Sequence, residues 1–180
     1  MKGKYLTIPN LLSVFRLLLI PVIIWLYCGK QAYNQALAVL ILSGVTDIAD
    51  GFIARKWNQT SDLGKVLDPV ADKLTQIATA WCLVSRYEYL WLLLGVLVVK
   101  EVFAGITGLY AVKKSGRIKS SDWHGKVNTA LLYAVMGLHM LWTDIPAPLS
   151  KGLMVLCIGM MCLSAVLYWL RNLRQIRGEG

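Results

Sequence analysis

Charged residues are scarce in this sequence, and acidic ones are the scarcest: 10 Asp and Glu stand against 19 Lys and Arg among 180 residues. Charged residues make up 16% of the chain and hydrophobic residues 57%, which is high for a soluble domain of this length. The composition therefore predicts a membrane protein. The basic residues cluster between apolar runs, so the net charge of +9 favours an anionic membrane surface or an anionic substrate over nucleic acid.

Residues that bind zinc and other transition metals are also few. The four cysteines do not have the spacing of metal ligands and lie within or beside apolar runs, which favours a packing role. The two histidines, His124 and His139, are isolated. We also find no internal repeat of the kind that many transporters have.

Six apolar runs predict six transmembrane helices. The first, Leu11 to Tyr27 with its flanks, has about the 20 residues that a bilayer span needs. It is long for a signal peptide, and no small-residue cleavage site follows it. The other runs are Ala32 to Ala54, Leu63 to Ser85, Trp91 to Ala111, Val127 to Trp142 and Leu149 to Leu170. The predicted fold class is an all-α polytopic integral membrane protein, with residues 1–180 as one domain.

The distribution of basic residues predicts the orientation of these helices. If the N-terminus is cytoplasmic, the outside holds Lys30, Arg86 and Lys151. The cytoplasmic side then holds a larger set: Lys2, Lys4, Arg55, Lys56, Lys65, Lys113, Lys114, Arg117, Lys119, Lys126, Arg171, Arg174 and Arg177. The positive-inside rule therefore predicts that both termini are cytoplasmic.

Two residues interrupt the first apolar run. Arg16 lies about two turns inside it, and an ionisable residue within a span is a functional candidate by default. The alternative is a side chain that snorkels to the membrane surface, and the sequence leaves both interpretations open. Pro21 is expected to kink the helix, because proline lacks the backbone N–H of a regular turn.

The acidic residues of most interest lie in residues 47–72, DIADGFIARKWNQTSDLGKVLDPVAD. Asp47 and Asp50 are three residues apart, so they share one face of a helix. Asp68 and Asp72 are four apart and do the same on the next helix. The turn that joins the helices is predicted from Gly51, Gln59, Thr60, Ser61 and Gly64. The two acidic pairs should therefore lie close together, at the cytoplasmic membrane face.

Four carboxylates in one space would repel one another and raise each other's pKa, and a bound divalent cation would keep them ionised. Carboxylate oxygens suit magnesium, manganese or calcium better than zinc. The stretch therefore predicts a metal site. A cation pathway is the alternative, but transporters usually place their sites near the midplane on broken helices.

The pattern Asp47-x2-Asp50-Gly51-x2-Ala54-Arg55-x8-Gly64-x3-Asp68-x3-Asp72 resembles the complete signature of the CDP-alcohol phosphotransferase family. The segments IPNLLSVFR, ARKWN, LDPVADK and GKVNT resemble its phosphatidylglycerophosphate synthase and cardiolipin synthase branch. This similarity extends to about Ala130, and the last two spans are recognised by hydropathy alone.

The resemblance implies a six-helix, homodimeric enzyme of the cell (inner) membrane with its active site at the cytoplasmic face. Such an enzyme transfers a phosphatidyl group from CDP-diacylglycerol to an alcohol, releases CMP, and uses Mg²⁺ or Mn²⁺, with two ions expected. The implied metal ligands are Asp47, Asp50, Asp68 and Asp72. Asp68 and Asp72 would be catalytic, and Asp72 would serve as ligand, general base or both. The residues implied on the CDP-donor side are Gly51, Ala54, Arg55 and Gly64.

The signature recognises the nucleotide side only and leaves the acceptor open. Glycerol 3-phosphate is the first choice and phosphatidylglycerol the alternative. Synthases that use glycerol 3-phosphate usually carry an Arg-Glu pair near the fourth helix and a further Arg; this chain has Lys100 and Glu101, then Thr107 and Tyr110. A lysine offers a point charge in place of a bidentate guanidinium clamp. Lys100 and Lys126 are the candidates for binding the acceptor phosphate. A non-enzymatic divalent-cation binder or carrier is the alternative from another functional class.

Overall fold

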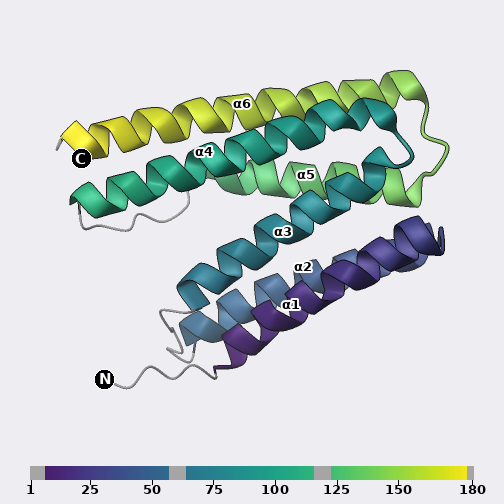
Figure 1. Cartoon of the computed structure of the whole chain (residues 1–180), viewed down its shortest axis with the longest axis horizontal. Helices are drawn as coiled ribbons and strands as arrows, with labels where there is room; N and C mark the ends of the chain where they lie inside the picture. The colour runs from purple at the N-terminus through teal and green to yellow at the C-terminus, as the bar shows by residue number, and fades with distance from the viewer. Residues whose placement is uncertain (1–6, 57–63, 116–122, 178–180) are drawn as a thin grey trace. The chain divides into compact units, whose positions relative to one another are not determined.

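The computed structural model describes residues 7–56, 64–115 and 123–177, and in these ranges the chain forms helices and no strands (Figure 1). The predicted all-α fold class is therefore confirmed. The long helices are α1 (Ile8–Ile24), α2 (Tyr33–Lys56), α3 (Gly64–Val84), α4 (Trp91–Ser115), α5 (Trp123–Leu141) and α6 (Ala147–Arg177). A π-helix, η1 (Trp25–Gly29), continues α1, and a short 3-10 helix, η2 (Glu88–Leu90), precedes α4.

The start of α1 follows from Thr7 and Pro9. Thr7 has an extended backbone, and its side chain accepts a hydrogen bond from the backbone N–H of Asn10. Pro9 lies in the first turn, where a missing backbone N–H removes no helical hydrogen bond. Pro21 lies inside α1, and the helix continues past it to Ile24 before widening into η1. The kink predicted at Pro21 stays a prediction.

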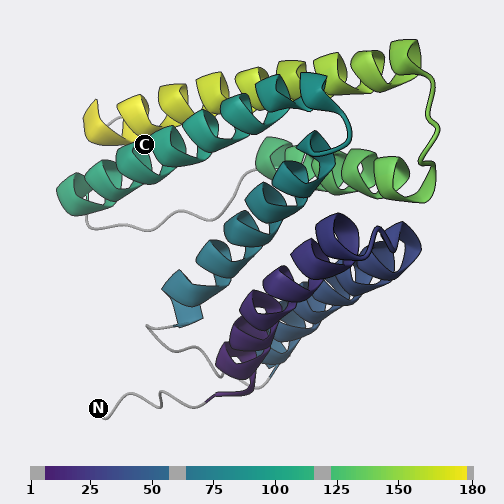
Figure 2. The ribbon, with the colours of Figure 1, turned by 45° about the vertical axis from the view of Figure 1, so that its right-hand side comes forward.

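The chain packs as two compact units. The first unit comprises Met1–Arg86 with Gly137–Thr143, and the second comprises Tyr87–Met136 with Asp144–Gly180. In the first unit α1 packs against both α2 and α3, and Figures 1 and 2 show α1 and α2 side by side. In the second unit α4 packs along α6. The acidic stretch lies on α2 and α3 of the first unit. Because α1 packs against both helices, it connects the two halves of this stretch. The expectation of a single domain stays a prediction.

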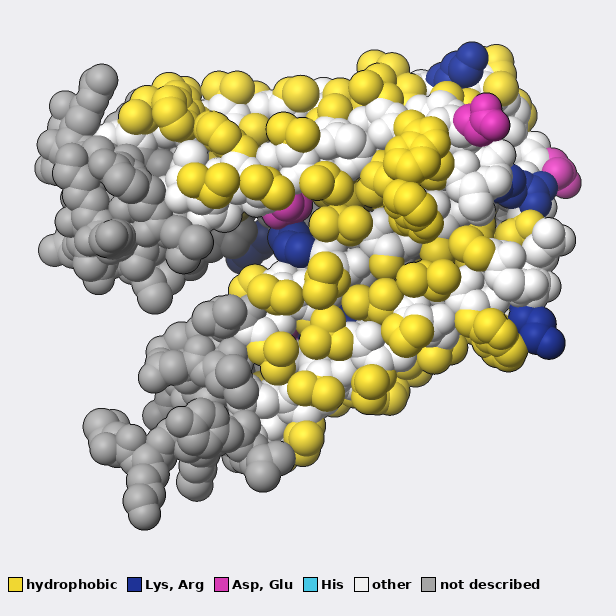
Figure 3. All heavy atoms as spheres, in the orientation of Figure 1, with side chains coloured by type: hydrophobic (Ala, Val, Ile, Leu, Met, Phe, Trp, Pro, Cys, Tyr) yellow, Lys and Arg dark blue, Asp and Glu magenta, His cyan; other side chains and the backbone are white. Residues whose placement is uncertain are grey.

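The first unit buries many polar side chains and exposes many large apolar ones. The buried polar residues of its helices are Asn10, Ser13, Arg16, Ser43, Thr46, Asp50, Thr75, Gln76, Thr79 and His139. In contrast, Leu18 is 63% exposed and Ile48 is 73% exposed. Figure 3 shows hydrophobic side chains spread over the outer surface of the helices. A soluble unit would show the reverse distribution, whereas lipid tails accept exposed apolar side chains.

Three stretches are long and apolar enough to cross a membrane: Ile8–Gly29, Glu88–Thr107 and Ala147–Arg171. They correspond to the first, fourth and sixth predicted spans. Among the described residues these three stretches are the candidate spans, and the crossing of the membrane by α2, α3 and α5 stays a prediction. The aspartates make α2 and α3 less apolar, because each charged side chain lowers the average hydropathy of its helix.

The turn between the acidic pairs is shorter than the sequence predicts. Gly51 lies inside α2, which continues to Lys56, so its assignment to the turn was wrong. A single glycine costs a helix only about 1 kcal/mol relative to alanine, and the helix-favouring residues Ala54, Arg55 and Lys56 follow it. Gly64 is the first residue of α3. Gln59, Thr60 and Ser61 lie outside the described residues.

Candidate metal centre

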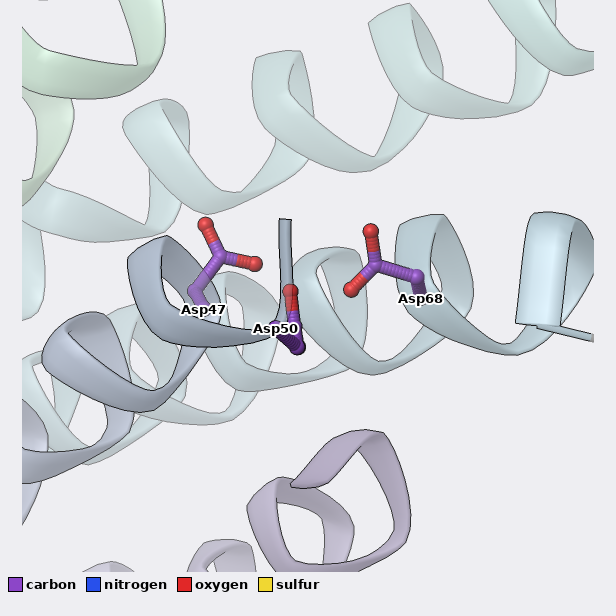
Figure 4. Close-up of side chains that lie close together, drawn as sticks. All are labelled: Asp47, Asp50 and Asp68. Carbon is purple, nitrogen blue, oxygen red and sulfur yellow. The ribbon is translucent and has the colours of Figure 1, made fainter. Parts of the chain in front are cut away.

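Three of the four predicted carboxylates converge in the first unit. Asp47 and Asp50 come from one face of α2, and Asp68 comes from the second turn of α3. One carboxylate oxygen from each residue lies within 4.8 Å of the others. Figure 4 shows the side chains of Asp47 and Asp68 on either side of Asp50 in this view. Helical spacing thus places the first pair as predicted, and the packing of the first unit adds Asp68.

The three carboxylates differ in their exposure. The Asp50 side chain is 3% exposed, whereas the side chains of Asp47 and Asp68 are 43% and 44% exposed. Asp50 lies on the buried side of α2 together with Ser43 and Thr46. The cluster therefore has a buried end at Asp50 and an accessible end at Asp47 and Asp68.

The guanidinium of Arg16 binds all three carboxylates. Its Nη1 lies 2.6 Å from Asp47 Oδ1 and 3.2 Å from Asp68 Oδ1, and its Nη2 donates to Asp50 Oδ2. The arginine side chain is completely buried, so the snorkelling interpretation of Arg16 was wrong. Sequence reasoning singled out Arg16 but gave it no partner, because the spacing of residues 47–72 does not show which other helix packs on them.

The donor set fits a hard divalent cation. Mg²⁺ takes oxygen ligands at about 2.1 Å in an octahedron, so opposite ligands are about 4.2 Å apart. At most one pair among three ligands can be opposite, and adjacent ligands are about 3.0 Å apart. Oxygens within 4.8 Å of one another would therefore close by up to roughly 2 Å to bind one ion. The three carboxylates carry more negative charge than the single guanidinium neutralises. Asp47, Asp50 and Asp68 are therefore suited to hold Mg²⁺ or Mn²⁺.

Asp72 lies one turn beyond Asp68 on α3, outside the group of oxygens within 4.8 Å. Its Oδ2 accepts a hydrogen bond of 2.9 Å from Gln76 Nε2 and lies 3.4 Å from Lys73 Nζ. Gln76 is buried, and sequence reasoning missed it. The spacing of Asp68, Asp72 and Gln76 at successive fourth residues was the signal that could have found it. The role of Asp72 as a ligand or base stays a prediction.

The residues expected on the donor side lie close to the cluster in the chain. Gly51, Ala54 and Arg55 follow Asp50 on α2, and their surroundings lie outside what the structure describes. Gly64 begins α3 and is half-buried. Their contacts with a donor stay predictions.

The two lysines expected at the acceptor belong to the second unit. Lys100 is buried in α4, and its Nζ lies 2.5 Å from Glu101 Oε1. Lys126 is exposed on α5. The structure thus gives Lys100 a counter-ion within its own helix, and it does not test the acceptor role of either lysine.

We next compared the sequence of the chain with known protein families. Residues 6–170 match the family described as CDP-alcohol phosphatidyltransferase. The chain belongs to the CDP-alcohol phosphatidyltransferase family. The match includes α1 to α5 and most of α6, so it covers both units of the chain.

The named relatives of this chain fall into two groups. It is 43% identical over 112 residues to a cardiolipin synthase (CMP-forming) of Streptomyces coelicolor, covering 59% of this chain and 52% of the relative. It is 32% identical over 167 residues to a CDP-diacylglycerol–glycerol-3-phosphate 3-phosphatidyltransferase of Blochmanniella floridana, covering 86% and 87%. The protein of that name from Escherichia coli K12 is 34% identical over 128 residues, covering 68% and 70%. The chain thus spans about half the length of the Streptomyces relative.

Proposed function

We propose that this protein synthesises phospholipid by transferring a phosphatidyl group from CDP-diacylglycerol to an alcohol, with release of CMP. The observation that carries the proposal is the convergence of Asp47, Asp50 and Asp68 within a chain of this family. The names of the relatives support the donor, since the Blochmanniella and Escherichia proteins are named for CDP-diacylglycerol and the Streptomyces protein for CMP formation.

The chemistry needs a neutralised donor and an activated acceptor. Mg²⁺ or Mn²⁺, with two ions expected, would supply the positive charge that lets an oxygen approach the donor diphosphate. Asp47, Asp50 and Asp68 would hold the metal, with Asp72 as a further ligand or as the base. In the transfer, the acceptor oxygen forms a bond to the phosphatidyl phosphorus, the bond from that phosphorus to the CMP oxygen breaks, and CMP leaves.

Asp72 is the proposed general base for the acceptor hydroxyl. A carboxylate within hydrogen-bond reach can take the hydroxyl proton in the transition state. The hydrogen bond from Gln76 holds the Asp72 carboxylate in one orientation, which favours such a role. Gly51, Ala54, Arg55 and Gly64 would contact the cytidine and phosphates of the donor.

The proposed acceptor is glycerol 3-phosphate, with phosphatidylglycerol as the alternative. The relatives named for glycerol 3-phosphate align over more of this chain, up to 86%, whereas the cardiolipin synthase has the higher identity, 43%. The difference in coverage favours glycerol 3-phosphate. The lysine at position 100 favours the monoanionic phosphodiester of phosphatidylglycerol, because it makes a weaker clamp than arginine.

The experiment for this proposal uses the purified protein in detergent with CDP-diacylglycerol, Mg²⁺ or Mn²⁺ and a panel of acceptors. We expect CMP release that requires metal and acceptor, and a product with the mass of phosphatidylglycerophosphate. Cardiolipin as the sole product would correct the acceptor and leave the transfer chemistry in place. Metal binding without CMP release from any acceptor would favour a cation binder or carrier instead.

The proposed topology has six spans in the cell (inner) membrane, a homodimer, and both termini and the aspartates on the cytoplasmic side. It predicts that a single cysteine introduced in residues 113–126, in a background without native cysteines, is labelled by a membrane-impermeant maleimide only from the cytoplasmic face. The matched control is a cysteine at Lys151, which should be labelled only from outside. Labelling of the 113–126 cysteine from outside would contradict the orientation.

The proposed acceptor phosphate site makes a separate prediction about Lys126. Replacing Lys126 with Ala should raise the apparent KM for the acceptor about tenfold, because a charge-assisted contact to a phosphate contributes roughly 1.5–3 kcal/mol. The apparent KM for CDP-diacylglycerol should stay within about twofold. Steady-state kinetics with each substrate varied in turn measures both values, and Lys151→Ala is the control. An equal rise in both KM values would place Lys126 elsewhere than at the acceptor.

A further inference from the structure

Arg16 is the only buried side chain among the described residues of the first unit that carries a positive charge, and it lies against the proposed metal ligands. Each of its two terminal nitrogens contacts the cluster, and together they contact Asp47, Asp50 and Asp68. The same three residues supply the oxygens within 4.8 Å of one another. The guanidinium and a divalent cation would therefore bind the same three carboxylates.

The remaining nitrogen of Arg16 supports this reading of the contact. The buried Nε has no hydrogen-bond partner among the described residues. Burial of this N–H costs free energy, because the unsatisfied donor loses its hydrogen bonds to water. Arg16 is thus held in place by the carboxylates rather than by a complete set of hydrogen bonds. The ion pairs of Arg16 with Asp47, Asp50 and Asp68 therefore depend directly on the charge of the cluster.

We infer that Arg16 is a built-in counter-ion that competes with the divalent metal for the carboxylates of Asp47, Asp50 and Asp68. This inference rests on the proposed metal site. Without metal, the guanidinium neutralises part of the repulsion among the three carboxylates and keeps α1 bound to α2 and α3. When metal binds, the two cations repel each other, so Arg16 gives up contacts with the carboxylates. Arg16 is a positioning residue in this account, because it sets metal affinity through the ligands.

The direction in which metal affinity changes on removal of Arg16 distinguishes charge competition from a scaffold role. If Arg16 competes, its removal must strengthen metal binding, because a positive charge within a few ångströms of a buried cation is strongly unfavourable. If Arg16 only shapes the cluster, its removal must weaken metal binding, because the ligands lose their orientation. A purely structural role therefore predicts the opposite sign.

The test measures Mn²⁺ binding to the full chain in detergent, with the free Mn²⁺ signal in electron paramagnetic resonance as the readout. Arg16→Met keeps an unbranched stem that reaches about as far as Nε of the arginine and removes the charged end. We expect it to bind Mn²⁺ roughly tenfold or more tightly than the wild type. Its metal-free Tm should fall below that of the wild type, and Mn²⁺ should restore most of the loss. Arg16→Lys, which keeps a charge but cannot bridge three carboxylates, should give a smaller rise in affinity.

Ser13→Ala is the matched control. Ser13 is buried on α1 one turn before Arg16, and its hydroxyl donates to Pro9 O in the same helix. This variant should leave Mn²⁺ affinity unchanged. Equal or weaker Mn²⁺ binding by Arg16→Met than by the wild type would overturn the inference. If Arg16→Met does not fold, Arg16→Lys decides in the same way. Absence of Mn²⁺ binding by the wild type would instead overturn the metal site, and the inference with it.

Discussion

Replacing Asp50 with Asn is expected to lower the rate of CMP release about a thousandfold. Metal ions supply several kcal/mol of charge stabilisation in the transition state, and about 4 kcal/mol corresponds to a factor of a thousand. Asp50 is the most buried of the three clustered carboxylates, so water cannot easily take its place. Initial rates with CDP-diacylglycerol and the acceptor measure the effect.

Two controls make this result specific to the cluster. Asp144→Asn is the same chemical change at an exposed position outside the cluster, and its rate should stay within about twofold of the wild type. Size-exclusion profiles and helical content should show that the Asp50→Asn variant remains folded. Raising the Mg²⁺ concentration should restore only a small part of the rate. A folded Asp50→Asn variant with more than a tenth of wild-type turnover would remove Asp50 from the proposed metal ligands.

Replacing Asp72 with Asn should also cause a large loss, but of a different kind. If Asp72 is the general base, kcat should fall roughly a hundredfold to ten-thousandfold, because that is the usual contribution of a positioned base. The affinity for Mn²⁺ and for CDP-diacylglycerol should change by less than about threefold. The amide oxygen of Asn can still accept the hydrogen bond from Gln76, so the side chain should keep its orientation.

The measurement that decides the role of Asp72 compares turnover with binding. Single-turnover rates report the chemical step, and Mn²⁺ and donor titrations report the ground state. Loss confined to turnover supports the base. Parallel loss of Mn²⁺ and donor affinity, as expected for replacement of a metal ligand, would assign Asp72 to the metal site instead.

The sequence was sufficient to predict the parts of the site that depend on local geometry. Asp47 and Asp50 share a face of α2 because their spacing is close to one helical turn, and the structure confirms that they lie together. The predicted proximity of Asp68 to this pair is confirmed too. The resemblance of residues 47–72 to a family signature supplied the chemistry, and the match over residues 6–170 confirms the family.

What the sequence did not reveal depends on packing between helices distant in the chain. Nothing in the spacing of residues 8–24 shows that Arg16 faces the aspartates, because α1 could turn any of its sides toward α2 and α3. Gly51 was assigned to a turn because glycine is a strong local signal, whereas the residues that follow it continue the helix. Gln76 was missed because glutamine carries no motif of its own.

The burial of Arg16 has a consequence for how the protein is made. In the proposed topology α1 enters the bilayer first. Arg16 then has no carboxylate partner until α2, which carries Asp47 and Asp50, has been synthesised. An arginine costs an inserting helix at most about 2.5–3.5 kcal/mol, the value at the helix centre, and a Leu, Ile, Val or Phe returns about 0.3–0.6 kcal/mol. Roughly seven such residues offset the arginine, and α1 contains more than that. The apolar surplus of α1 therefore serves the nascent chain, during the interval before the aspartates arrive to neutralise the guanidinium.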